Sequence, residues 1–294
     1  MNIFRYSAKD TYLFMYTTAM FVLPMCIALY TTPNIWWLLF APFHAYLLAN
    51  LQNTSLHHQS HWPMFVNNQW NEYYEIFMSA SSGLPHQHWK YAHTLHHKYV
   101  NDKPETPGGD TKDPVSVFKF STDGTPINFW VYSVWNARFD FFAIFRLFQF
   151  ARPGMKKYAV QYKREQIAIK VFFVLIALIN FYYVLALLAT YYLGYAMNRA
   201  ISYGEHWTVH DRRGDTTQDS VNSYNKLVNW LGFGAGMHQE HHHRPGVHWS
   251  QYATVTPLLH PNRKVVNSFP RGLHISNNPF WDHFKELFKK KSVS

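Results

Sequence analysis

Two short stretches of this chain repeat the same spacing of histidines. Each has the pattern His-x-x-His-His, once in HTLHHKYVND and once in MHQEHHHRP. The members of the two triplets are His93, His96 and His97, followed by His238, His241 and His242. A helix repeats every 3.6 residues, so residues at i, i+3 and i+4 share one face. Each triplet therefore predicts a cluster of imidazoles, and imidazole is a ligand for iron, zinc, copper and nickel.

Further histidines follow apolar segments. His57 and His61 lie in HHQSHWP, with His58 beside them, and His206 and His210 lie in GEHWTVHD. The two triplets, the first pair and His206 together supply nine ligands. A structural zinc needs four protein ligands, and a catalytic zinc needs three and a water. Nine ligands are enough for two metal ions that keep open coordination positions.

The single cysteine restricts the chemistry. Cys26 lies inside an apolar segment, so the chain has no disulfide framework and no cysteine-based zinc or iron–sulfur site. Any metal must be held by histidine and oxygen ligands. Because the histidines adjoin apolar segments, the fitting chemistry is oxygen activation at a pair of non-haem irons, directed at a substrate that enters from lipid.

Two long uncharged runs predict membrane-spanning helices. No Asp, Glu, Lys or Arg occurs between Asp10 and Glu72, and that run holds apolar segments at 12–30 and 35–51, separated by TTPN. A bilayer span takes about 20 mostly apolar residues, so the pair is expected to form a transmembrane hairpin. Two buried helices of a soluble core are the alternative. The length of the segment and the second one that follows at once argue against a cleaved signal peptide.

The number of membrane crossings in the second uncharged run decides on which side of the membrane the second triplet lies. If the two triplets meet at one site, the chain between His97 and His238 crosses the membrane an even number of times. The run 171–198 would be about 42 Å long as one helix, against a hydrocarbon core of about 30 Å. We therefore expect a second hairpin at 166–203. Residues 127–150 are a competing crossing, but their charged residues suit the membrane interface better.

These patterns predict an all-α, integral membrane helical bundle with four transmembrane helices as two hairpins. A helical cytosolic cap is expected to hold the metal site. One domain covers 1–294, and its parts are a first hairpin at about 12–51, a cytosolic segment at 52–165, a second hairpin at 166–203 and a cytosolic cap at 204–294.

The formal net charge of +10 arises from 27 basic and 17 acidic residues. Most of the basic residues lie in two blocks, Lys90–Arg164 and Arg199–Lys291, which the positive-inside rule assigns to the cytoplasm. The chain lacks the signature of a nucleic-acid-binding fold, so we expect no nucleic acid partner. Anionic membrane lipids and an acidic redox partner suit this charge. A bacterial inner membrane and an endoplasmic reticulum both fit.

These histidines resemble those of the membrane fatty acid desaturase and hydroxylase superfamily, which carries three histidine boxes in the order His-x(3,4)-His, His-x-x-His-His and His-x-x-His-His. The resemblance spans about residues 12–250. In this chain the boxes are His57 and His61, then His93, His96 and His97, then His238, His241 and His242. The family has one more ligand at the end of its fourth membrane helix. The match to GEHW places it at His206, and the spacing to the third box places it at His210; His58 is a further candidate.

The resemblance implies a mushroom-shaped protein with two iron ions where four membrane helices meet a cytosolic cap. It also implies a reaction in which dioxygen and two electrons remove hydrogen from an unactivated C–H bond. Loss of a second hydrogen desaturates a fatty-acyl chain, whereas return of oxygen hydroxylates an alkyl or isoprenoid chain. Electrons would come from a separate ferredoxin, rubredoxin, or cytochrome b5 with its reductase.

Two expectations concern the surroundings of the metals. Metal-bound imidazoles usually donate their other N–H to a carboxylate or carbonyl, and Asp102 and Asp211 are the predicted partners. His86 and His88 are further candidates for that role. The competing functional class is a transporter of zinc or another divalent ion, which should place its histidines within the spans, where only His44 lies.

Overall fold

The computed structural model describes residues 3–32, 34, 36–145 and 153–267. Over these residues the chain forms helices, loops and two isolated β-bridges, and it has no strand, so the all-α prediction is confirmed. The chain divides into two compact units. Unit 1 comprises Met1–His93 and Ala137–Asn198, and unit 2 comprises Thr94–Asn136 and Arg199–Ser294. The basic segment KELFKKK, at 285–291, lies outside the described residues.

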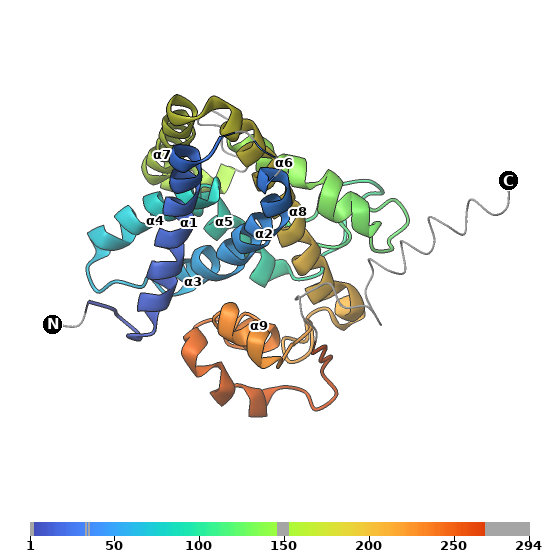
Figure 1. Cartoon of the computed structure of the whole chain (residues 1–294). Helices are drawn as coiled ribbons and strands as arrows, with labels where there is room; N and C mark the ends of the chain where they lie inside the picture. The colour runs from blue at the N-terminus through green and yellow to red at the C-terminus, as the bar shows by residue number, and fades with distance from the viewer. Residues whose placement is uncertain (1–2, 33, 35, 146–152, 268–294) are drawn as a thin grey trace, which may run out of the picture. The chain divides into compact units, whose positions relative to one another are not determined.

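Unit 1 begins with a pair of helices. They are α1 (Asp10–Tyr30) and α2 (Trp36–Leu51), drawn in blue in Figure 1. The Tyr16 hydroxyl donates to the carbonyl of Leu47 at 2.5 Å, and the Trp37 indole donates to the Thr31 hydroxyl at 2.8 Å. These bonds join the two helices near both ends of their contact. The expected first helical pair is therefore present, although part of the TTPN turn lies outside the described residues.

Among the described helices, α1 alone is long and apolar enough to cross a membrane by length and composition. Most of its apolar segment is not buried by the rest of the chain. Met15 and Leu29, for example, are 60% and 59% exposed. The predicted arrangement of four spans therefore stays a prediction.

The helix α2 continues into the first histidine pair through an irregular turn. A π-helical segment, Gln52–Leu56, joins it to α3 (His57–His61). A π-helical turn inserts a residue into the helical repeat and so changes the face on which later side chains lie; such turns are frequent at functional sites. The Asn53 side chain donates to that of Asn198 at 2.6 Å, which fixes this turn against α8.

The next two helices carry polar residues into the interior of unit 1. They are α4 (Asn68–Ser82) and α5 (His86–Tyr99). Asn67 caps α4 by accepting from the amide of Gln69 at 2.8 Å. The helix ends at Gly83, whose φ of +69° is the left-handed conformation that favours glycine. A Cβ there would lie 2.5 Å from the Tyr195 hydroxyl oxygen.

A second helical pair occupies the expected region of the chain. After a short 3₁₀ segment, Pro153–Tyr158, come α7 (Ala159–Ile179) and α8 (Phe181–His206). Asn180 has an extended backbone and separates the two helices. Its side-chain amide donates to the carbonyl of Thr31 at 3.1 Å. Phe173 and Tyr191 pack edge to face across the pair, with ring centroids 5.3 Å apart. The long uncharged run is therefore two helices, with α7 starting earlier than predicted and packing against α4.

The stretch 127–150 forms no long continuous helix in its described part. In unit 2 it contributes the π-helical turn Val131–Trp135, and in unit 1 it contributes α6 (Ala137–Ala143). Residues 146–150 lie outside the described residues, so the competing crossing is only partly covered.

Unit 2 consists of short helices and ordered loops. Its helical elements after α8 are η4 (Trp207–Arg212), α9 (Lys226–Leu231), α10 (His238–His243), η5 (Trp249–Thr254) and η6 (Thr256–Leu258). The core includes Val117, Phe118, Phe129, Tyr132, Ala200 and Tyr203. The Tyr203 hydroxyl donates to the carbonyl of Ile127 at 2.9 Å, which ties the last turns of α8 to the preceding loop.

Candidate metal centres

Three predicted ligands lie together in unit 1. His57 and His61 are the first and last residues of α3, and His93 lies on α5. The ring centroid of His93 is 4.4 Å from that of His57 and 4.9 Å from that of His61. One nitrogen of each ring lies within 4.8 Å of the others. These three residues are called the unit 1 histidine cluster.

Burial keeps a member of this cluster in the form that binds metals. Loss of hydration, together with the nearby charge of Lys90, lowers the pKa of His61 to about 4. The ring is therefore neutral at pH 7 and offers a lone pair. His58, the further candidate, packs its ring against Trp62 with centroids 5.4 Å apart and is not part of the cluster.

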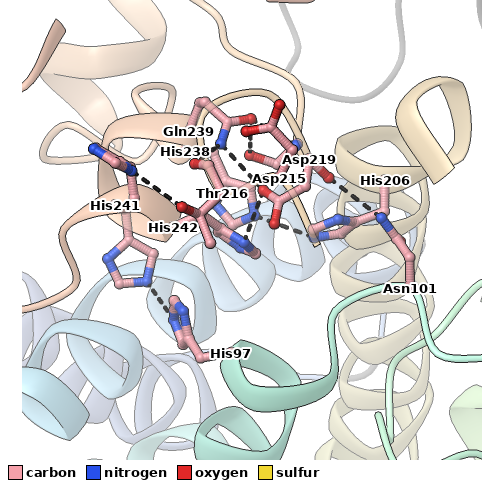
Figure 2. A network of polar contacts seen from close by, with 12 residues as sticks. His97, Asn101, His206, Asp215, Thr216, Asp219, His238, Gln239, His241 and His242 are labelled. Atoms are coloured by element: carbon pink, nitrogen blue, oxygen red, sulfur yellow. Dashed lines mark hydrogen bonds and ion pairs between the residues drawn. The ribbon is translucent and has the colours of Figure 1, made fainter. Parts of the chain in front are cut away.

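Four predicted ligands lie together in unit 2, and all four are buried. They are called the unit 2 histidine cluster and are His96, His206, His238 and His242. His96 is on the last part of α5, His206 ends α8, and the other two lie on α10. Figure 2 shows His206, His238 and His242 turned toward one another.

The rings of this cluster are close enough to share one ion. The Nε2 atoms of His206 and His238 lie 3.3 Å apart, and one nitrogen of each of the four rings lies within 4.8 Å of the others. Nε2 of His242 is buried and has no hydrogen-bond partner among the described residues. A buried nitrogen without a partner is costly unless a ligand satisfies it. A metal ion would supply that partner.

The electrostatics of the unit 2 cluster also favour a metal. Burial lowers the pKa of His238 to about 3, and it holds the pKa values of His206 and His242 well below their usual range. Each ring adds to this effect because its neighbours would repel a second positive charge. Neutral imidazoles are the form that coordinates metals.

Carboxylates lie against the outer nitrogens of this cluster. Both carboxylate oxygens of Asp113 lie 3.1 Å from Nδ1 of His96, which fixes the orientation of that ring. An oxygen of Asp219 lies 3.6 Å from Nδ1 of His242. Burial raises the pKa of Asp219 to about 6. Glu205 differs from these two, because its Oε2 lies 3.5 Å from Nε2 of His238, the nitrogen that faces His206.

His97 and His241 form a pair within unit 2. Their Nε2 atoms lie 2.8 Å apart, and the Tyr252 hydroxyl lies 3.0 Å from Nδ1 of His241 (Figure 2 shows the two histidines). The second nitrogen of His241 is therefore held by a phenol, and the first points at another imidazole. Two facing imidazole nitrogens suit a shared ligand.

The short helix α10 is held in place by the two residues between its histidines. Gln239 accepts from the amide of Ser220 at 2.6 Å and donates to the carbonyl of Thr216 at 2.6 Å. The carboxylate of Glu240 accepts from the hydroxyl of Tyr224 at 2.8 Å and from the side-chain amide of Asn222 at 2.7 Å. These bonds anchor the opposite face of a six-residue helix that could not be stable alone.

Other predicted residues lie elsewhere. The ring of His210 packs against Phe118, Nδ1 bonds to the carbonyl of Trp207, and the residue does not join either histidine cluster. Asp102 accepts from the amide of Lys112 at 2.8 Å, and Asp211 is exposed. Over the described residues, neither carboxylate forms a hydrogen bond or ion pair with a histidine of the two clusters.

The carboxylates and the phenol beside the histidines were not among the predicted residues. They are Asp113, Glu205, Asp219 and Tyr252. Glu205 had a signal in its place next to His206. The other three lie in loops or short helices with no spacing pattern that links them to a histidine box.

The family model of the fatty acid desaturases matches residues 8–267. A search of curated proteins and a search of solved structures each gave no match. The match covers most of the chain and all three histidine boxes, so the protein belongs to the fatty acid desaturase family, as its histidine pattern indicated. Membership makes it an oxidoreductase of the desaturase and hydroxylase type, from a membrane-bound, iron-binding family that acts on lipid chains.

Proposed function

We propose that this protein uses dioxygen and two external electrons to desaturate a fatty-acyl chain at a non-haem diiron centre. The observation that carries the proposal is the unit 2 cluster, in which four buried histidines converge and Nε2 of His242 has no hydrogen-bond partner among the described residues. Hydroxylation of an alkyl or isoprenoid chain is the alternative outcome, because no short motif fixes where a substrate carbon lies relative to the metals.

Nine histidines are the proposed ligands of two irons. They are His57, His61, His93, His96, His97, His206, His238, His241 and His242. Iron bound there would supply the oxidising power for C–H cleavage. The chain's own part is to present unprotonated rings and to fix their orientation. Asp113 contributes to this orientation, because its carboxylate oxygen lies 3.1 Å from Nδ1 of His96.

Four helices are the proposed membrane spans: α1, α2, and the pair α7 and α8. The support lies in apolar side chains that the chain leaves exposed. On α7, for example, Val174 and Leu178 are 56% and 79% exposed, and on α8 Leu185 is 55% exposed. Exposed apolar surface on paired helices is what contact with lipid would require. The two basic blocks support a cytoplasmic position for the histidines.

An external electron donor is part of the proposal. The sequence has one cysteine and no dinucleotide-binding glycine pattern, so it lacks a recognisable iron–sulfur or flavin centre of its own. A ferredoxin, a rubredoxin, or cytochrome b5 with its reductase would fill this role. The excess of positive charge on the chain would attract an acidic donor.

The test is product analysis with a defined electron supply. Purified protein in lipid is given iron, dioxygen, reduced ferredoxin and a saturated fatty-acyl lipid, and the products are separated by mass. A fatty-acyl product that is about two mass units lighter than the substrate supports desaturation, and one that is about sixteen heavier identifies hydroxylation. Zinc in place of iron, with no product and with metal flux into vesicles, would instead support the transporter.

A further inference from the structure

Unit 1 contains a second group of potential ligands that includes none of the box histidines. Glu75 lies on α4, His86 is the first residue of α5, and Glu165 lies on α7. One ligand atom of each lies within 4.8 Å of the others. Burial is nearly complete, with exposures of 6%, 0% and 0% respectively. Such a set of two carboxylates and an imidazole is expensive to bury without a compensating ion.

Two potential ligand atoms of this group have no hydrogen-bond partner among the described residues. Oε1 of Glu165 and Nδ1 of His86 are buried and have no hydrogen-bond partner among the described residues. Nδ1 of His86 lies 3.7 Å from Oε1 of Glu75, which is too long for a hydrogen bond. The second polar atom of each of these two side chains does have a partner. Oε2 of Glu165 accepts from the amide of Gln87 at 2.9 Å, and Nε2 of His86 lies 3.4 Å from the Ser60 hydroxyl.

Burial raises the pKa of both Glu75 and Glu165, because the buried surroundings disfavour a negative charge. The charge of Lys90 acts on both carboxyl groups in the opposite direction. Keeping both carboxylates ionised here is costly unless a further cation is bound. The Gln59 and Gln87 side chains donate to Glu75 at 3.4 and 2.9 Å, and such neutral donors reduce this cost without removing the charge.

We propose that Glu75, His86 and Glu165 bind a divalent metal cation, at a third metal site that uses none of the box histidines. Imidazole suits zinc, iron and related ions, and carboxylates suit manganese and other hard ions, so the mixed set favours a first-row divalent ion such as Mn²⁺ or Zn²⁺. The ion joins α4, α5 and α7, and through Ser60 and Gln59 it supports the helix that carries the first histidine pair. Its role is structural.

Anomalous X-ray diffraction on crystals of the full chain exposed to Mn²⁺ tests this site directly. The expected result is a manganese peak in contact with all three side chains. Glu165→Gln should remove that peak. Glu72→Gln, a change at an exposed glutamate of the same helix as Glu75, should retain it.

Elemental analysis gives a second measurement that does not depend on crystals of the variant. One divalent ion per chain should be lost in Glu165→Gln while the metal content of the histidine clusters is kept. A wild-type map with no peak at these residues would overturn the proposal and would indicate a shared proton instead. The third metal site and the proposed function can fail independently. A manganese peak at Glu75, His86 and Glu165 would support the third site even if the histidine clusters hold no iron.

Discussion

At the scale of single residues, the site depends on which nitrogen each histidine turns toward the metal. Asp113 determines this for His96, and it also accepts from the amide of Val115 at 3.0 Å, so its own position is fixed by the backbone. Tyr252 plays the corresponding part for His241. The partners of these two proposed ligands are therefore part of the proposed site.

The exchange Asp113→Asn should weaken iron binding. The amide keeps the shape of the side chain but loses the charge that holds the proton on Nδ1 of His96. Loss of such a partner typically costs roughly 10- to 100-fold in metal affinity. Iron affinity would be measured by competition with a chelator. Asp110→Asn, at a half-exposed carboxylate paired with Lys119, is the control and should bind iron normally. Equal affinity in the two variants would contradict the role of Asp113.

The ambiguity between His206 and His210 is also a matter of single residues. The structure places His206 within the unit 2 cluster and His210 outside it. We expect His206→Ala to lose iron and His210→Ala to keep it. Elemental analysis of both purified variants tests this, and the reverse result would favour the spacing rule of the third box.

At the scale of the elements, the positions of the histidines depend on breaks in the helices. The π-helical turn before His57, the left-handed cap at Gly83 and the extended residue Asn180 each end or redirect a helix. The sequence predicted the helical pairs and both triplets because apolar length and histidine spacing are local signals. It did not predict the π-helical turn or the contact between Asp113 and His96, because these depend on packing between distant segments.

The cap at Gly83 provides a test at this scale. In Gly83→Ala the added methyl would meet the Tyr195 hydroxyl at 2.5 Å in a left-handed backbone. We expect destabilisation of about 1–3 kcal/mol, measured as a lower midpoint of thermal unfolding. Gly124→Ala is the matched control, because it shares the positive φ but meets no atom within 4 Å. A similar loss of stability in both variants would mean that the contact with Tyr195 does not contribute to the destabilisation of Gly83→Ala.

At the scale of the whole molecule, we propose a membrane stem with the histidine clusters on the cytosolic side. Composition predicted this arrangement through two uncharged runs and two basic blocks. The helical pairs are present, but only α1 meets the criteria of length and apolarity over the described residues. The helix α2 has 16 residues, fewer than the roughly 20 that a bilayer span takes, and α7 carries Lys163, Arg164 and Lys170.

Labelling of single cysteines tests the topology. In a Cys26→Ser background, Thr32→Cys lies in the turn of the first helical pair, and Lys226→Cys lies at the start of α9. A thiol reagent that cannot cross membranes should label Thr32→Cys from outside intact cells or sealed vesicles of known orientation. It should label Lys226→Cys only after the membrane is opened. Labelling of both from the same side would contradict the predicted hairpin.

The most direct test of the central claim is Mössbauer spectroscopy with iron analysis on purified wild type and on His242→Ala. We expect about two irons per chain with a magnetically coupled spectrum in the wild type. The variant should lose the coupled signal, because Nε2 of His242 is buried without a hydrogen-bond partner among the described residues and is a proposed iron ligand. Coupled iron that persists in His242→Ala, or zinc in place of iron in the wild type, would contradict the assignment of the unit 2 cluster to one iron of a diiron centre.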